Sequence, residues 1–220
     1  MKKLLVVLFS SLLILGTVGL AGATTISFVD VLENIDSGPT FSSGDGVVNL
    51  GVTSFTILGG FGTVASIDGN PSANLSHRLT RGLGVYSGEL DEVDSLSYKE
   101  KISISFNDYV TVNSLTVRSL FIEGNDVEKG RINFFKDGVW LSSDYIDLTA
   151  TQSGGDGELT VLANSALLID EIRFVVPLDQ SYTGFSEYAV AKLNINVPEP
   201  TTLLLLGFGI LGLAGLRRKE

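Results

Sequence analysis

The stretch Glu100-Lys-Ile-Ser-Ile-Ser-Phe106 decides the fold class, because apolar and polar side chains alternate along it from Ile102 onward. Its three apolar residues fall on one face of an extended chain, and its two serines fall on the other. A period of two with one apolar face predicts a half-buried β-strand.

Short apolar runs separated by turn-forming residues continue on both sides of this stretch. The clearest turn is Lys136-Asp-Gly-Val139, because Asp-Gly accepts the positive φ values of a two-residue hairpin loop. Helical periodicity is nearly absent, and only residues 162–169 could form a turn or two. The further predicted strands are residues 26–29, 47–57, 109–112, 115–122, 131–135, 139–141, 145–148, 158–162, 170–176 and 187–197.

Many short strands without alternating helices predict an all-β fold, an antiparallel β-sandwich of jelly-roll-like order. The alternative is a parallel β-helix, which is disfavoured because the sequence has no fixed repeat period. Residues 59–76 are rich in small polar residues and lack a period, so we expect a long surface excursion there.

The residues that catalysis usually needs are scarce in this sequence. His77 is the only histidine, and we expect it to face solvent; a protein zinc site normally uses several His or Cys ligands. There is no cysteine and no Gly-x-Ser-x-Gly nucleophile motif. We identify no catalytic residue and expect a protein without enzymatic activity.

The predicted mature body, residues 24–196, is strongly acidic. It holds ten Lys and Arg residues and 23 Asp and Glu residues, a net charge of −13. A nucleic-acid-binding surface must be cationic, so we expect no nucleic acid partner, and divalent cations or neutral glycans fit better. No disulfide can support this body, since the sequence has no cysteine, but a body of this length can bury a single core.

A loop with four carboxylates lies in the middle of the chain. Its acidic residues are Glu89, Asp91, Glu92 and Asp94. Several carboxylates together could bind calcium and brace the turn expected at residues 82–85, since calcium prefers oxygen ligands. The loop lacks the spacing of an EF-hand, and a solvated acidic loop is the favoured alternative; apart from calcium we expect no cofactor.

The predicted hairpin places two aromatic residues on its outer face. Its register pairs Lys136 with Val139 and Phe135 with Trp140. Val139 and the apolar residues of the preceding strand then share the core face, which leaves Phe135 and Trp140 on the other. Either residues 59–76 cover this pair, which we favour, or it offers a stacking platform to a glycan.

The two ends of the chain carry sorting features. Lys2 and Lys3 precede an apolar run, and Ala21 and Ala23 then give the small residues of a signal peptidase cleavage site. Residues 1–23 are therefore a predicted signal peptide. At the other end, residues 203–216 contain no ionisable side chain and predict a single transmembrane helix. At about 1.5 Å per residue this helix reaches roughly 21 Å, a marginal span of a core of about 30 Å.

The order of elements in residues 197–220 resembles the PEP-CTERM sorting signal of Gram-negative bacteria. The motif residues are Pro198, Glu199, Pro200, Arg217, Arg218 and Lys219. The resemblance implies a transient inner-membrane anchor, processing by exosortase, and delivery to the cell surface or to an extracellular biofilm matrix. Less specifically, Gly82-Leu-Gly-Val85, the acidic loop and the strand after Glu100 resemble a block of the β-sandwich domains of such surface proteins.

These observations predict an exported surface or matrix protein whose body binds or spaces extracellular polysaccharide. Two alternatives remain at this point. One is a secreted glycan-cleaving enzyme, because the chain has many carboxylates that could act in pairs. The other is a purely structural matrix protein without a ligand.

Overall fold

The structure is a computed structural model of the whole chain. It describes residues 22–29, 47–49, 54–56, 64–68, 74–78, 81–86, 93–94, 100–177 and 186–197. The chain divides into a compact unit, Thr24–Ile195, and a second unit formed by Met1–Ala23 and Asn196–Glu220. The predicted signal peptide up to Ala21 and the predicted sorting helix lie outside the described residues.

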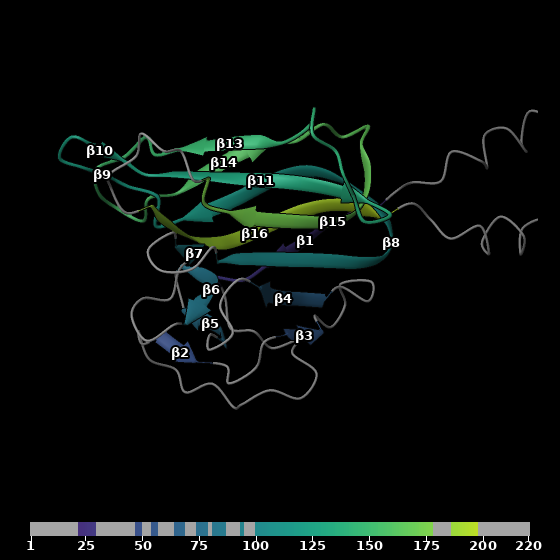
Figure 1. The fold of residues 1–220 in the computed structure, drawn as a ribbon, viewed down its shortest axis with the longest axis horizontal. Helices are drawn as coiled ribbons and strands as arrows, with labels where there is room; N and C mark the ends of the chain where they lie inside the picture. The colour runs from purple at the N-terminus through teal and green to yellow at the C-terminus, as the bar shows by residue number, and fades with distance from the viewer. Residues whose placement is uncertain are drawn as a thin grey trace, which may run out of the picture. The chain divides into compact units, whose positions relative to one another are not determined.

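All regular elements among the described residues are strands, which confirms the all-β prediction (Figure 1). They are β1 Gly22–Ser27, β2 Val47–Asn49, β3 Ser54–Thr56, β4 Val64–Asp68, β5 Asn74–Arg78, β6 Gly82–Tyr86, β7 Val93–Asp94, β8 Lys101–Arg118, β9 Ile122–Glu123, β10 Asp126–Val127, β11 Lys129–Lys136, β12 Val139–Trp140, β13 Ile146–Thr149, β14 Leu159–Leu162, β15 Leu168–Val175 and β16 Glu187–Val197. Fourteen of them form one sheet, whose main path is β12-β11-β15-β8-β16-β6-β5-β2, and β9 and β10 form a separate hairpin. Every strand pair whose register is defined is antiparallel, so the parallel β-helix alternative is wrong for this part of the chain.

The long strand β8 organises the sheet, because its two halves have different neighbours. Its first half pairs with β15 on one edge and with β4 on the other, while its second half pairs with the start of β15 at Val110 and Thr111 and then with β14. The pairing of β8 with residues 159–175 changes register twice. After Ala163, residues 164–167 add three extra residues on the side of β14 and β15; between Ile169 and Glu171, residues 106–109 add three extra residues on the side of β8. The second change restores the first register, and β8 bends at residues 106–109 (Figure 1).

Tyr188 of β16 shows that the sheet folds back into two packed layers. Its side chain is fully buried, and its hydroxyl donates a hydrogen bond of 2.9 Å to the Val175 carbonyl oxygen of β15. The Arg131 carbonyl oxygen of β11 lies 3.4 Å from the same hydroxyl. Neither β11 nor β15 is adjacent to β16 in the sheet, so the side chain spans the core between layers. The jelly-roll-like strand order stays a prediction.

Glycines make the closest approaches between strands. Gly82 of β6 has φ +122, and a Cβ there would lie 2.2 Å from the Val190 carbonyl oxygen of β16. A Cβ at Gly130 would lie 2.6 Å from the Tyr188 ring. These two positions allow β6 and β11 to lie against β16 without displacing it.

Two predictions of local structure are wrong. Residues 59–76 are not one irregular excursion, because β4 pairs with β8 within them and β5 begins at Asn74. Val139 does not lie in the core: it is 63% exposed, at the tip of the β11–β12 hairpin. His77 lies in β5, where it pairs with Val48 and Leu83, and its exposure to solvent stays a prediction. The two corrections depend on contacts between distant segments, which the pattern of a single strand does not contain.

Candidate ligand-binding face

The outer face of the layer formed by β12, β13, β11 and β15, here called the aromatic face, carries the candidate site. Alternation along β11 sends Ile132 and Phe134 into the core and the odd-numbered residues outward. Their cross-strand partners continue the same face. Phe135 lies opposite Trp140 and Glu171, Asn133 opposite Arg173, and Arg131 opposite Asp147 and Val175. The predicted hairpin register is therefore correct.

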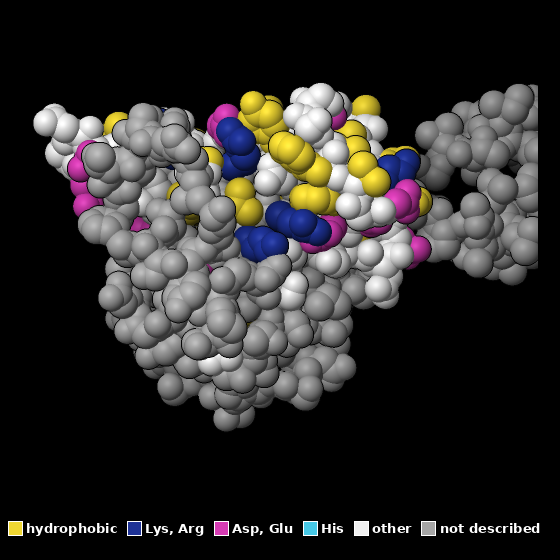
Figure 2. All heavy atoms as spheres, in the orientation of Figure 1, with side chains coloured by type: hydrophobic (Ala, Val, Ile, Leu, Met, Phe, Trp, Pro, Cys, Tyr) yellow, Lys and Arg dark blue, Asp and Glu magenta, His cyan; other side chains and the backbone are white. Residues whose placement is uncertain are grey.

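Aromatic and basic side chains meet on this face. Figure 2 shows hydrophobic side chains gathered with Lys and Arg side chains among them, in the region where Figure 1 draws β11 and β15. Trp140 is 46% exposed, whereas Phe135 is only 8% exposed. Of the predicted aromatic pair, the Phe135 ring is therefore covered and the Trp140 ring is open to solvent.

The side chain that covers Phe135 is Arg173. Its guanidinium lies 3.8 Å from the centre of the Phe135 ring. Glu171 holds the guanidinium in place, accepting hydrogen bonds of 2.6 Å from Nε and 3.0 Å from Nη2. The expected cover was residues 59–76, but β4 within them lies beyond β8 in the sheet and is not next to β11. Phe135 is therefore the base of the face and not a contact surface.

Tyr145 is a second open ring that sequence reasoning missed. It directly precedes β13, where Ile146 pairs with Ile132, and so continues the row to a place opposite Asn133. The Tyr145 ring is 41% exposed, and the Arg131 guanidinium lies 4.3 Å from its centre. The alternation Tyr-Ile-Asp-Leu was visible in the sequence, but its pairing partner was not.

Both guanidinium groups on the face are neutralised within it. Arg131 Nε donates a 2.6 Å hydrogen bond to Asp147 Oδ1, and this carboxylate raises the pKa of Arg131. Arg173 is paired with Glu171 in the same way. Between the two pairs the buried Oδ1 of Asn133 accepts no hydrogen bond from the described residues. The face therefore offers aromatic rings and polar groups with no net charge from its two arginines.

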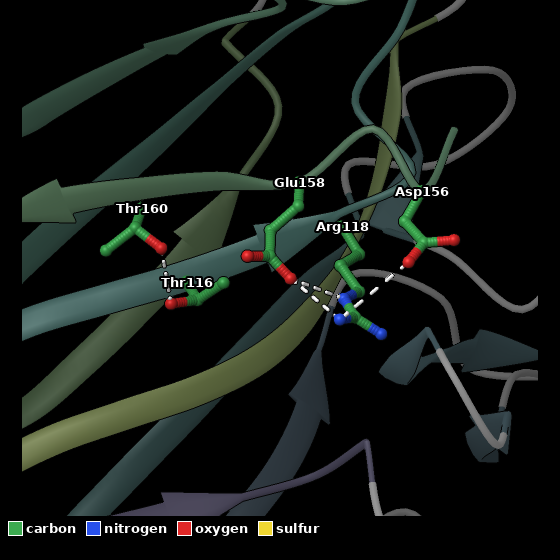
Figure 3. Close-up of polar contacts among 5 residues, drawn as sticks. All are labelled: Thr116, Arg118, Asp156, Glu158 and Thr160. Carbon is green, nitrogen blue, oxygen red and sulfur yellow. Dashed lines mark hydrogen bonds and ion pairs between the residues drawn. The ribbon is translucent and has the colours of Figure 1, made fainter. Parts of the chain in front are cut away.

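A second polar cluster lies where the second half of β8 meets β14. Figure 3 shows Arg118 between Glu158 and Asp156, at 2.7 Å and 3.8 Å, with the Thr116 and Thr160 hydroxyls 2.8 Å apart beside them. Both carboxylates are largely exposed, so these ion pairs are worth little energetically. The cluster fixes the turn before β14 and presents no aromatic ring.

The calcium prediction stays a prediction. Glu89, Asp91 and Glu92 lie outside the described residues, and Asp94 lies in β7 opposite Glu187. The expected turn at residues 82–85 is wrong, since these residues belong to β6. Within the described ranges, no group of three His, Asp or Glu residues could hold a metal ion.

The sorting residues fall mostly outside the described ranges. Ala21 and the six residues of the C-terminal motif are not described, while Ala23 is exposed near the start of β1. No helix in the described part of the chain is long and apolar enough to cross a membrane.

Comparison with known proteins identifies the C-terminal element. Residues 196–219 match the family described as the PEP-CTERM protein-sorting motif. This confirms the predicted resemblance: the chain carries the sorting signal of an exported protein that is anchored in a membrane before processing. No curated protein matches the chain.

Two solved structures resemble the body. The F5/8 type C domain of a Bacteroides fragilis protein is 13% identical, with 50% of this chain and 76% of that domain covered and a TM-score of 0.32. CpGH89CBM32-5 from Clostridium perfringens, solved in complex with GalNAc-β-1,3-galactose, is 15% identical. The match covers 61% of this chain and 95% of that chain, with a TM-score of 0.32. At these scores neither likeness bears on the function.

Proposed function

We propose that this protein is exported by its signal peptide, is processed by exosortase in the inner membrane, is then delivered to the cell surface or matrix, and binds extracellular polysaccharide through the aromatic face. The observation that carries the binding proposal is the open pair Trp140 and Tyr145 on one face, flanked by Arg131 and Asn133. Signal peptidase and exosortase are its processing partners, and the cell surface or the biofilm matrix of a Gram-negative bacterium is its destination.

The ligand that suits this face is a neutral polymer. Open aromatic rings pack against the C–H faces of sugars, while amide, guanidinium and carboxylate groups exchange hydrogen bonds with hydroxyls. Both arginines already have carboxylate partners, and the body carries a net charge of −13, which repels a polyanion. Electrostatic attraction therefore contributes little, and binding should change little with salt concentration.

A polysaccharide pull-down tests this function. Trp140→Ala and Tyr145→Ala should each weaken retention on insoluble host matrix polysaccharide, and Leu162→Ala is the matched control because Leu162 is exposed elsewhere. Equal retention of all three variants and the parent would refute the binding proposal. Retention of the parent that disappears in high salt would refute the neutral ligand.

Sorting is tested separately at the motif. Replacement of Pro198, Glu199 and Pro200 by alanine should leave export intact and trap the unprocessed protein in the inner membrane. Processing at the parental rate in the native host would contradict the exosortase assignment.

We propose further that the protein has no enzymatic activity. A glycosidase needs two carboxylates that are free to exchange protons at a defined separation. The two carboxylates of the aromatic face, Asp147 and Glu171, are instead engaged by Arg131 and Arg173. Incubation with the bound polysaccharide should release no reducing ends.

A further inference from the structure

The end of the Thr24–Ile195 unit at which β8 bends brings together segments that are distant in the sequence. Tyr109, in the bend, donates a 2.6 Å hydrogen bond to Asp137 in the β11–β12 turn. Leu168, at the start of β15, lies opposite Thr111, and the Ala163 amide donates to the Asn113 carbonyl oxygen at 3.0 Å. Figure 1 shows the tip of β11, the bend of β8 and the start of β15 at this same end, here called the bend end.

Both ends of the folded unit leave from the bend end. Asn113 of β8 donates a 2.9 Å hydrogen bond to Asn194 of β16, and Asn194 in turn lies 3.5 Å from Thr25 of β1. The amide of Phe28, directly after β1, donates a hydrogen bond to the carbonyl oxygen of Ala191 in β16, so β1 begins beside the end of β16. The chain therefore enters and leaves the body next to the bend of β8.

Five of the six large hydrophobic side chains exposed among the described residues are at this end. They are Leu162 (83% exposed), Val139 (63%), Trp140 (46%), Tyr109 (41%) and Leu168 (39%). The side chains come from the hairpin tip, the bend of β8, the end of β14 and the start of β15. Exposed apolar residues gathered from four segments indicate a contact surface.

The short linker after β16 limits how far the bend end can lie from the membrane while the anchor is inserted. Only five residues, 198–202, separate Val197 from the apolar run that begins at Leu203. Fully extended, five residues reach at most about 17 Å. The headgroup region on each side of a bilayer is about 5–7 Å deep, the difference between total and hydrocarbon thickness. While the anchor is in the membrane, the bend end cannot move far from the lipid headgroups.

We propose that the bend end is a membrane-docking surface, which rests on the lipid headgroups through Leu162, Leu168, Val139 and Tyr109 while the C-terminal anchor is in place. The proposal depends on the anchoring that is part of the proposed function. Asp108, Asp137 and Asp170 outnumber Lys136 at this end, so the surface suits zwitterionic headgroups and is repelled by anionic ones.

Site-specific quenching tests the docking surface. The chain has no cysteine, so Leu162→Cys and Val139→Cys each create a unique attachment point for an environment-sensitive fluorophore. Glu123→Cys is the matched control, because Glu123 is also exposed and lies in the β9–β10 hairpin at the opposite end of the unit (Figure 1). The full-length variants are reconstituted into phosphatidylcholine vesicles with and without a spin-labelled headgroup quencher, and flotation measures anchoring.

We expect all three variants to float with the vesicles, and the labels at residues 162 and 139 to be quenched more than the label at residue 123. Flotation with equal quenching at all three sites would overturn the docking surface and leave the anchor intact. Failure to float would overturn the anchoring and the docking surface together. Quenching that is stronger with anionic than with zwitterionic vesicles would overturn the assigned headgroup preference.

Discussion

Tyr188→Phe is the most informative single change, because it removes one buried hydroxyl and leaves the ring in place. The lost hydrogen bond to the Val175 carbonyl oxygen measures 2.9 Å. Such a bond contributes about 0.5–1.5 kcal/mol, and the buried acceptors then lack a donor, so we expect the variant to be less stable by about 1.5 kcal/mol at pH 8. For a body of this size that lowers Tm by roughly 3–6 °C, at about 2–4 °C per kcal/mol.

The stability difference between the parent and the Tyr188→Phe variant should depend on pH. Burial raises the pKa of Tyr188 well above its ordinary value, because the low-dielectric core disfavours the phenolate. The unfolded chain releases this proton near pH 10, while the folded protein retains it. The stabilising contribution is therefore complete below pH 10 and is lost as pH rises toward the folded pKa. The parent loses up to about 1.4 kcal/mol per pH unit that the phenylalanine variant does not lose.

The two effects together predict that the stability difference depends on pH. The deficit of about 1.5 kcal/mol at pH 8 should shrink as the pH rises above the ordinary tyrosine pKa of about 10. Urea unfolding of residues 24–197 at pH 8, 9, 10 and 11, followed by the fluorescence of Trp140, measures the difference. A stability difference that stays constant up to pH 11 would show that the Tyr188 hydroxyl ionises equally in both states, and a more stable variant at pH 8 would contradict the hydrogen bond.

Three further predictions concern packing and the acidic loop. Gly82→Ala should destabilise the body by about 3 kcal/mol in urea unfolding, since a Cβ would collide with the Val190 carbonyl oxygen and φ is positive. The matched control is Gly138→Ala, where φ is also positive but a Cβ would meet no atom within 4 Å, and it should cost only about 1 kcal/mol. Phe135→Ala should cost about 3–5 kcal/mol and Trp140→Ala about half as much, because the first ring lies under Arg173 and the second is half exposed; equal losses in thermal melts would disprove this division of roles. If the acidic loop binds calcium, millimolar calcium should raise Tm by mass action and a chelator should reverse the effect, whereas an unchanged Tm leaves the loop a solvated surface.

The sequence determined the features that depend on neighbouring residues. Alternation in Glu100–Phe106 specified the strand face, and Asp137-Gly138 specified the hairpin register, because both follow from local backbone geometry. The motif at the C-terminus was readable for the same reason, since its proline, apolar and basic residues act in linear order. Nothing beyond the order of residues was needed for these predictions.

Only the tertiary structure decided which side chains meet across the sheet. Arg173 covers Phe135 from a strand 38 positions later in the chain, and Tyr145 joins the aromatic face through pairing with β11. The two compensating insertions that bend β8 lie more than 50 positions apart, so neither is recognisable alone. Pairing between distant strands depends on the packing of the whole sheet, and a local pattern therefore predicts that a residue faces outward but not what covers it.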